Sequence, residues 1–98
     1  MILEKDMNFS EIIQGEKVLV DFFATWCGPC KMIAPVLEKF AAAHPEITVI
    51  KVDVDDFPTI ANEYGIRSIP TLIYFSKGEI VEQKLGFMDL NKLESWLA

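Results

Sequence analysis

The sequence predicts an α/β protein with one mixed β-sheet, made of central parallel strands and a C-terminal antiparallel hairpin, with helices on both faces. Apolar segments of strand length alternate with segments of helical periodicity along much of the chain. Such alternation is typical of parallel strands joined by right-handed crossovers. Further on, two strand-like segments flank the turn sequence "SKG", which indicates a β-hairpin. At 98 residues, the chain is expected to form a single domain over residues 1–98.

The first half of the chain predicts two strands and two helices. Residues 1–4 are expected to form a short strand, and "NFSEIIQ" (8–14) a short helix. Residues 17–24 are apolar on both alternating faces, a pattern typical of a central strand covered on both sides. Residues 30–43 place apolar side chains at helical spacing, and Pro35 among them is expected to kink the helix.

The second half predicts three further strands and two further helices. Residues 47–54 form a second buried strand, and residues 58–65 begin at a proline and end at a glycine, as helices often do. Residues 71–75 and 79–85 form the hairpin, and residues 89–98 form a closing helix with a stripe of leucines. The expected order is therefore βαβαβαββα. Reactive residues in such sheets lie at the carboxyl ends of strands.

Composition and charge argue against several classes of function. Fifteen acidic residues against nine basic ones give a net charge of -6, which disfavours nucleic acids and anionic membranes as partners. No stretch approaches the ~20 apolar residues of a membrane span. The chain turns charged at Glu4, so its first residues lack the apolar run of a secretory signal. We therefore expect a cytoplasmic protein.

Both cysteines of the chain, Cys27 and Cys30, lie in the segment "FFATWCGPCK". A closed zinc site needs about four ligands, and the only other soft ligand, His44, would lie on the order of 20 Å away along a helix. A structural disulfide that closes so short a loop contributes only on the order of 2 kcal/mol. The sequence therefore predicts no metal site, and it favours a redox pair over a structural disulfide.

The geometry expected of this segment suits reversible disulfide chemistry. Residues three apart on a helix have Cβ atoms ~5–6 Å apart, whereas a disulfide requires ~3.5–4.5 Å, so a small adjustment makes or breaks the bond. We expect Cys27 to be exposed at the helix N-terminus, where free N–H groups and the helix dipole stabilise a thiolate, and Cys30 to be buried. Gly28 is expected to allow a tight turn, and Pro29 suits the first turn because its missing N–H costs nothing there.

The segment "VDFFATWCGPCKMIAP" resembles the thioredoxin family, and the resemblance continues through "KVDVDD", "YGIRSIPTL", "KGE" and Gly86 to cover nearly the whole chain. It implies a protein-disulfide reductase and dithiol electron carrier in which Cys27 attacks and Cys30 resolves the mixed disulfide. No bound cofactor is implied beyond this redox-active disulfide. The implied partners are oxidised client proteins and an NADPH-dependent flavoprotein, thioredoxin reductase, and we expect a monomer.

Asp21 and Lys51 are the candidate proton-transfer residues. Asp21 lies within an apolar strand, where burial raises the pKa of a carboxyl group. Taken alone, Asp21 fits a proton carrier or an ordinary hydrogen-bonded polar group, and Lys51 fits a solvated residue of a strand. The resemblance implies that Asp21 accepts the proton of the resolving thiol, and that Lys51 approaches Asp21 and favours its charged form.

The resemblance also implies a client-binding surface around the cysteines, formed by Trp26, Gly28, Pro29, Ile69, Pro70 and Gly86. Since only about 5–6% of X–Pro bonds in folded proteins are cis, the sequence alone predicts a trans bond before Pro70. The family instead keeps this proline cis and facing the cysteines, which leaves the Ile69 main chain free to pair with an extended client. One departure is Phe23, where many thioredoxins carry a second tryptophan; we expect it to alter packing behind the site and the choice of partner.

Two other functions remain open at this point. An oxidase or isomerase of the same fold is disfavoured by Pro29, because the oxidising members of the family usually carry histidine at that position. A binding module that uses only the fold is disfavoured by the presence of both cysteines and Asp21. Met32, Phe40 and Trp96 are expected to serve packing rather than chemistry.

Overall fold

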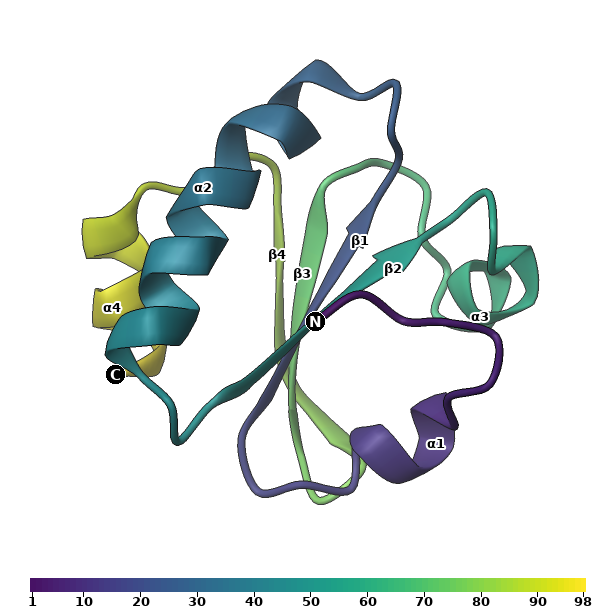
Figure 1. Cartoon of the computed structure of the whole chain (residues 1–98), viewed down its shortest axis with the longest axis horizontal. Coiled ribbons are helices and arrows are strands. Elements are labelled where there is room, and N and C mark those ends of the chain that lie inside the picture. The colour runs from purple at the N-terminus through teal and green to yellow at the C-terminus, as the bar shows by residue number, and fades with distance from the viewer.

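A four-stranded mixed sheet forms the centre of the molecule in the computed structural model, which describes all 98 residues (Figure 1). The strands are β1 (Val18–Phe23), β2 (Thr48–Asp53), β3 (Thr71–Ser76) and β4 (Glu79–Leu85), in the order β2-β1-β3-β4. β1 runs parallel to β2, whereas the β1–β3 and β3–β4 pairs are antiparallel. The mixed sheet and its C-terminal hairpin are confirmed, and the parallel pairing is confined to β1 and β2.

Two helices cover each face of the sheet. α1 (Phe9–Ile12) and α3 (Pro58–Glu63) lie on one face, and α2 (Gly28–Ala43) and α4 (Leu90–Leu97) lie on the other (Figure 1). α2 continues through Pro35 and ends at His44, whose ring nitrogen Nε2 lies 2.8 Å from Oε2 of Glu94 in α4. None of the four helices has the length and apolar character needed to cross a membrane.

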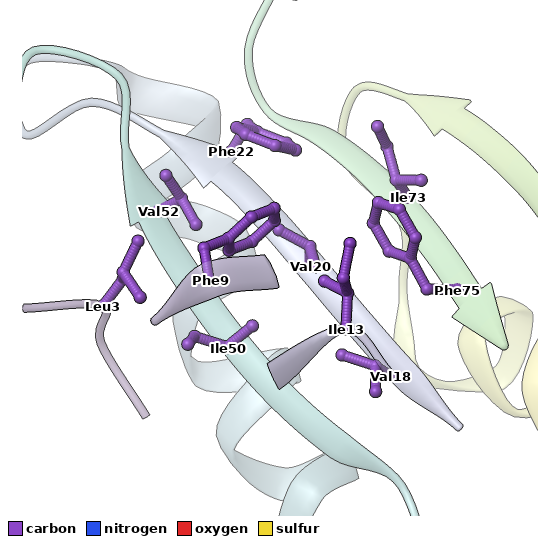
Figure 2. Packing of buried hydrophobic residues seen from close by; sticks show 10 residues of the cluster. All are labelled: Leu3, Phe9, Ile13, Val18, Val20, Phe22, Ile50, Val52, Ile73 and Phe75. Carbon is purple, nitrogen blue, oxygen red and sulfur yellow. The ribbon is translucent and has the colours of Figure 1, made fainter. Parts of the chain in front are cut away.

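The face covered by α1 and α3 has a core without a buried charge. Three strands contribute to it, because alternate residues of a strand point to the same side of the sheet. Figure 2 shows this cluster, in which side chains from the N-terminal segment and α1 pack against side chains of the three strands. Its buried members are Leu3, Phe9, Ile13, Val18, Val20, Phe22, Ile50, Val52, Ile73 and Phe75.

The face covered by α2 and α4 has a second core, and it includes a buried charge. Its apolar members are Leu19, Ile33, Leu37, Phe40, Ile47, Val49, Leu72 and Leu93. Asp21 lies two residues after Leu19 on β1 and therefore points to this same face, fully buried. The buried Phe40 serves packing, as expected, whereas Met32 is 61% exposed and does not.

The expected strand at residues 1–4 is wrong as an extended element. The segment makes a single parallel bridge, between Ile2 and Lys51, supported by N–H···O bonds from Leu3 to Lys51 and from Lys51 to Met1, each 2.8 Å long. Charged residues follow immediately and the chain turns at Lys5 and Asp6, so strand pairing stops. The segment nevertheless occupies the outer edge of β2.

Candidate redox site

The two cysteines lie after the carboxyl end of β1, at the start of α2. Cys27 is the N-cap of α2, with an extended backbone (φ -89°, ψ 116°), and its Sγ accepts a hydrogen bond of 3.2 Å from the N–H of Cys30. The helix begins at Gly28, earlier than the expected residue 30, because Cys27 itself acts as the capping residue. This placement directs the positive end of the helix dipole at the sulfur of Cys27.

Cys27 and Cys30 form a disulfide, with their Cα atoms 5.2 Å apart. Both residues are buried, at 5% and 3% exposure, so the expectation that Cys27 is exposed is wrong for the oxidised form. The reason is local packing: Cys27 and Cys30 cluster with Ala24 and are flanked by partly buried apolar side chains, among them Ile69. A molecule that approaches the disulfide must therefore contact the residues around it.

Gly28 does not serve the role that the sequence suggested. Its φ is not in the left-handed region, and a Cβ atom added to it would meet no atom within 4 Å. The turn into α2 therefore does not require glycine. Gly28 and Pro29 are both exposed, in the sequence between the two cysteines.

The segment before β3 lies against the disulfide. The Ile69–Pro70 peptide bond is cis, as the family resemblance implied, and the Ile69 carbonyl oxygen lies 3.7 Å from Sγ of Cys27. Pro70 is buried, and its carbonyl oxygen accepts a 2.8 Å hydrogen bond from the N–H of Gly86. Gly86 itself has a φ of 85°, in the region that favours glycine. The structure thus places Ile69 beside Cys27, and Gly86 is hydrogen-bonded to the next residue, Pro70.

Trp26 is the most exposed large apolar side chain, at 68%. Its indole N–H donates a 2.8 Å hydrogen bond to Oδ2 of Asp55, and the N–H of Asp55 in turn donates to Oδ1 of Asp53. Sequence analysis missed Asp55, although its place just after the carboxyl end of β2, alongside Trp26 after β1, was a usable signal. The contact holds the ring at the rim of the site.

Asp21 is the unusual charged group of the site. It is 0% exposed, and neither of its carboxylate oxygens has a hydrogen-bond partner within the protein. Burial raises the pKa of Asp21 from 3.8 to about 6, and the charge of Lys51 counteracts part of that rise. Lys51 stands directly opposite Asp21 in the β1–β2 register. The carboxyl group can therefore gain or lose a proton near neutral pH.

Lys51 does not pair with that carboxylate. Its ammonium nitrogen lies 4.6 Å from the centroid of the Phe23 ring, and none of the ion pairs in the structure includes Lys51. Phe23, Lys51 and Cys30 all line a hollow of about 240 Å³ beside the start of α2. Lys51, the second cysteine and Phe23 therefore line one hollow, and Asp21 is the register partner of Lys51 on β1.

Comparison with known proteins agrees with this geometry. A family model described as Thioredoxin matches residues 1–98. The thioredoxin of Alicyclobacillus acidocaldarius is 54% identical over 95 residues, covering 95% of this chain and 90% of that protein. The thioredoxin of Chlamydia trachomatis is 51% identical over 86 residues, covering 88% and 84% respectively.

Solved structures give the same result for the fold. Plasmodium falciparum thioredoxin superposes with a TM-score of 0.90 at 39% identity, covering 99% of this chain and 98% of that one. Malassezia sympodialis thioredoxin superposes with a TM-score of 0.86 at 40% identity, covering 97% and 87%.

Proposed function

The chain belongs to the thioredoxin family, and we propose that Cys27 attacks the client disulfide and that Cys30 resolves the mixed disulfide. It is a thiol–disulfide oxidoreductase that reduces protein disulfides with its own redox-active cysteine pair and no bound cofactor. In the reduced protein, the Cys27 thiolate attacks one sulfur of a client disulfide, forms a mixed disulfide and releases the first client thiol. Cys30 then loses its proton and attacks Sγ of Cys27, which releases the second client thiol. Two electrons pass to the client, and the Cys27–Cys30 disulfide forms.

The position of Cys27 at the start of α2 is the observation that carries this assignment. Only Cys27 lies at the N-cap, where the Cys30 N–H and the helix dipole favour a thiolate. Cys30 lies inside the first turn and beside the hollow lined by Lys51. The two sulfurs are therefore chemically distinct although both are buried.

Asp21 is proposed to accept the proton of Cys30 during resolution. A carboxyl group whose pKa is about 6 can take up a proton near neutral pH, and no hydrogen bond within the protein commits its oxygens elsewhere. Lys51 favours the charged form from across the β1–β2 pair. Asp21→Asn should slow decay of a mixed disulfide measured by stopped flow; unchanged decay across pH 6–9 would remove Asp21 from the mechanism.

Clients are proposed to bind across the apolar rim of the disulfide. This surface comprises Trp26, Gly28, Pro29, Ile69, Pro70 and Gly86. Trp26 supplies exposed aromatic area, and the open space at Gly28 leaves room for an extended chain. The main chain of Ile69 supplies hydrogen-bonding groups next to Cys27, so binding there would align a client disulfide with the nucleophile.

We further propose that the protein is a single-domain monomer in the cytoplasm. There it would take part in electron transport by exchanging thiols and disulfides with other proteins. Its oxidised form would be recycled by an NADPH-dependent flavoprotein, thioredoxin reductase, and its other partners would be oxidised client proteins. The membership of the family supports reductase and client partners in general.

Reduction of insulin disulfides with dithiothreitol as electron source tests the activity. We expect the protein to accelerate the precipitation of reduced insulin over dithiothreitol alone, and Cys27→Ser to abolish the acceleration. No acceleration by the parent protein would favour a binding module that keeps only the fold.

A further inference from the structure

Phe23 contacts one of the two charged groups of the site, the Lys51 ammonium group, and contributes no reacting atom. It follows Asp21 by two residues on β1, so both side chains point toward α2. Its ring is half-buried and lines the hollow beside Cys30. The sequence marked Phe23 only as a departure from a tryptophan common in the family.

The position of the Lys51 ammonium group requires an explanation. Lys51 and Asp21 are directly paired in register on neighbouring strands, about 4.8 Å apart, and a lysine side chain is long enough to reach a carboxylate at that distance. A buried carboxylate without a hydrogen bond should attract an ammonium group strongly. Lys51 instead places its nitrogen 4.6 Å from the centroid of the Phe23 ring, within the ~6 Å range of a cation–π contact.

We propose that Phe23 is a positioning residue of the reaction: its ring holds the Lys51 ammonium group beside the hollow at Cys30 and keeps it off the Asp21 carboxylate. This inference rests on the proton-acceptor role proposed above for Asp21. The ring competes with the carboxylate for one cation, and the carboxylate remains unpaired in consequence. Phe23 acts only through Lys51 and Asp21.

Separation of Lys51 from Asp21 preserves the basicity of the carboxylate. An ammonium group in direct contact lowers the pKa of a carboxyl by about 1–3, and a weaker base accepts a proton from a thiol less readily. The charged and titratable groups facing this region are Lys51 and Asp53 from β2, Cys30, Lys31 and Glu38 from α2, and the N-terminal ammonium group of Met1. β3 and α4 contribute the apolar Leu72 and Leu93. Lys51 is the only one of these charges that shifts the pKa of Asp21.

The test is a titration of the Asp21 carboxyl carbon by NMR in the oxidised protein, with Phe23→Leu as the variant. Leucine keeps an apolar side chain but removes the aromatic face, so Lys51 is free to pair with Asp21. We expect the midpoint to fall from about 6 by about 1 or more, and the acid limb of mixed-disulfide decay to move with it. Phe23→Trp, which restores an aromatic face, should return the midpoint to the parent value.

A fall in the Asp21 midpoint could also come from better hydration of the carboxyl group in Phe23→Leu. Repeating the substitution in a Lys51→Met background separates this cause from ion pairing. In Lys51→Met, where no ammonium group is available, Phe23→Leu should leave the Asp21 midpoint unchanged. An equal fall in both backgrounds, or no fall in either, would overturn the proposal. The role of Asp21 is judged separately, by the decay of the mixed disulfide in Asp21→Asn, so failure of that role and failure of this inference give different results.

Discussion

The two faces of the sheet differ in what they bury. The face under α1 and α3 buries ten hydrophobic side chains and no charge, including the T-shaped pairs that Phe75 makes with Phe9 and Tyr64 at 6.3 and 5.6 Å between ring centroids. The face under α2 and α4 buries a comparable apolar cluster and also Asp21, whose carboxylate has no partner.

The difference teaches that stability and chemistry are divided between the faces of a single sheet. A buried carboxylate lowers the stability of the folded state once it is charged, so the face that carries it depends on apolar packing elsewhere. The aromatic cluster around Phe75 supplies such packing at the far side of the sheet. Substitutions on the two faces should therefore change different measurable properties.

The largest effect is expected at the two cysteines, which lie on the α2 side. Cys30→Ser should trap clients as mixed disulfides through Cys27, because the resolving sulfur is missing, and turnover should fall by more than about 100-fold. Trapped species are counted on non-reducing gels after incubation with oxidised clients. Cys27→Ser is the matched control, and equal trapping by it would reverse the assigned roles.

A large change of another kind is expected at Phe75, on the α1 side. Phe75→Ala should lower the free energy of unfolding by ~3–5 kcal/mol, because it removes a fully buried ring that packs against Phe9 and Tyr64 and leaves a cavity. Denaturant titration measures this loss. Rates of insulin reduction, corrected for the folded fraction at low temperature, should stay at the parent level; a selective loss of rate would show that the two faces are not independent.

Asp21→Asn should have the opposite effect on stability. Between pH 3.8 and about 6, the folded protein keeps a proton on Asp21 that the unfolded chain has released, so the parent's free energy of unfolding falls as pH rises through this window. The rise in pKa corresponds to about 3 kcal/mol.

The asparagine variant has no carboxyl group to titrate at this position. The difference in free energy of unfolding, variant minus parent, should therefore be larger above pH 6 than below pH 3.8, by up to about 3 kcal/mol. The comparison is made by denaturant titration of both proteins at pH 3.5 and pH 8. A difference between the two proteins that stays constant across pH would contradict the raised pKa of Asp21.

The smallest effect is expected at the helix caps, which both faces share. The side chain of Asn8 accepts the N–H of Glu11 at the start of α1, and that of Asp89 accepts the N–H of Lys92 at the start of α4. Asn8→Ala and Asp89→Ala should each cost ~0.5–2 kcal/mol. Neither should alter client trapping, as measured on the same gels, and an altered trapping pattern would link a cap to the chemistry.

Periodicity and local signals predicted most of the architecture. The alternating apolar pattern of residues 17–24 located β1 and both of its covered faces, and the hairpin signal located β3 and β4. The strand predicted for residues 1–4 was wrong: the apolar start of this segment resembles a strand, but its pairing stops after one bridge. The apolar periodicity placed the start of α2 at residue 30, two residues too late, whereas the helix N-terminus expected at Cys27 agrees with the observed N-cap.

The candidate site was predictable as a set of residues but not as a set of contacts. The family resemblance placed Asp21, Lys51 and the cysteines together. No sequence signal indicates that a lysine opposite a carboxylate turns to an aromatic ring two residues further on. The contact of Asp55 with Trp26 joins the ends of two strands, so it could be inferred only from the meeting of strand ends at one edge of the sheet.

The short contact of the N-terminal residues with β2 has a consequence for how molecules meet in concentrated solution. An open strand edge offers unpaired N–H and C=O groups to any other chain, and it can seed aggregation. Residues 1–3 occupy those groups around Lys51, so the β2 edge is closed to a foreign strand there. The other edge, β4, is irregular instead, because its register with β3 shifts between Tyr74 and Phe75. A covered edge and a bulged edge together disfavour edge-to-edge pairing of the sheets of two molecules.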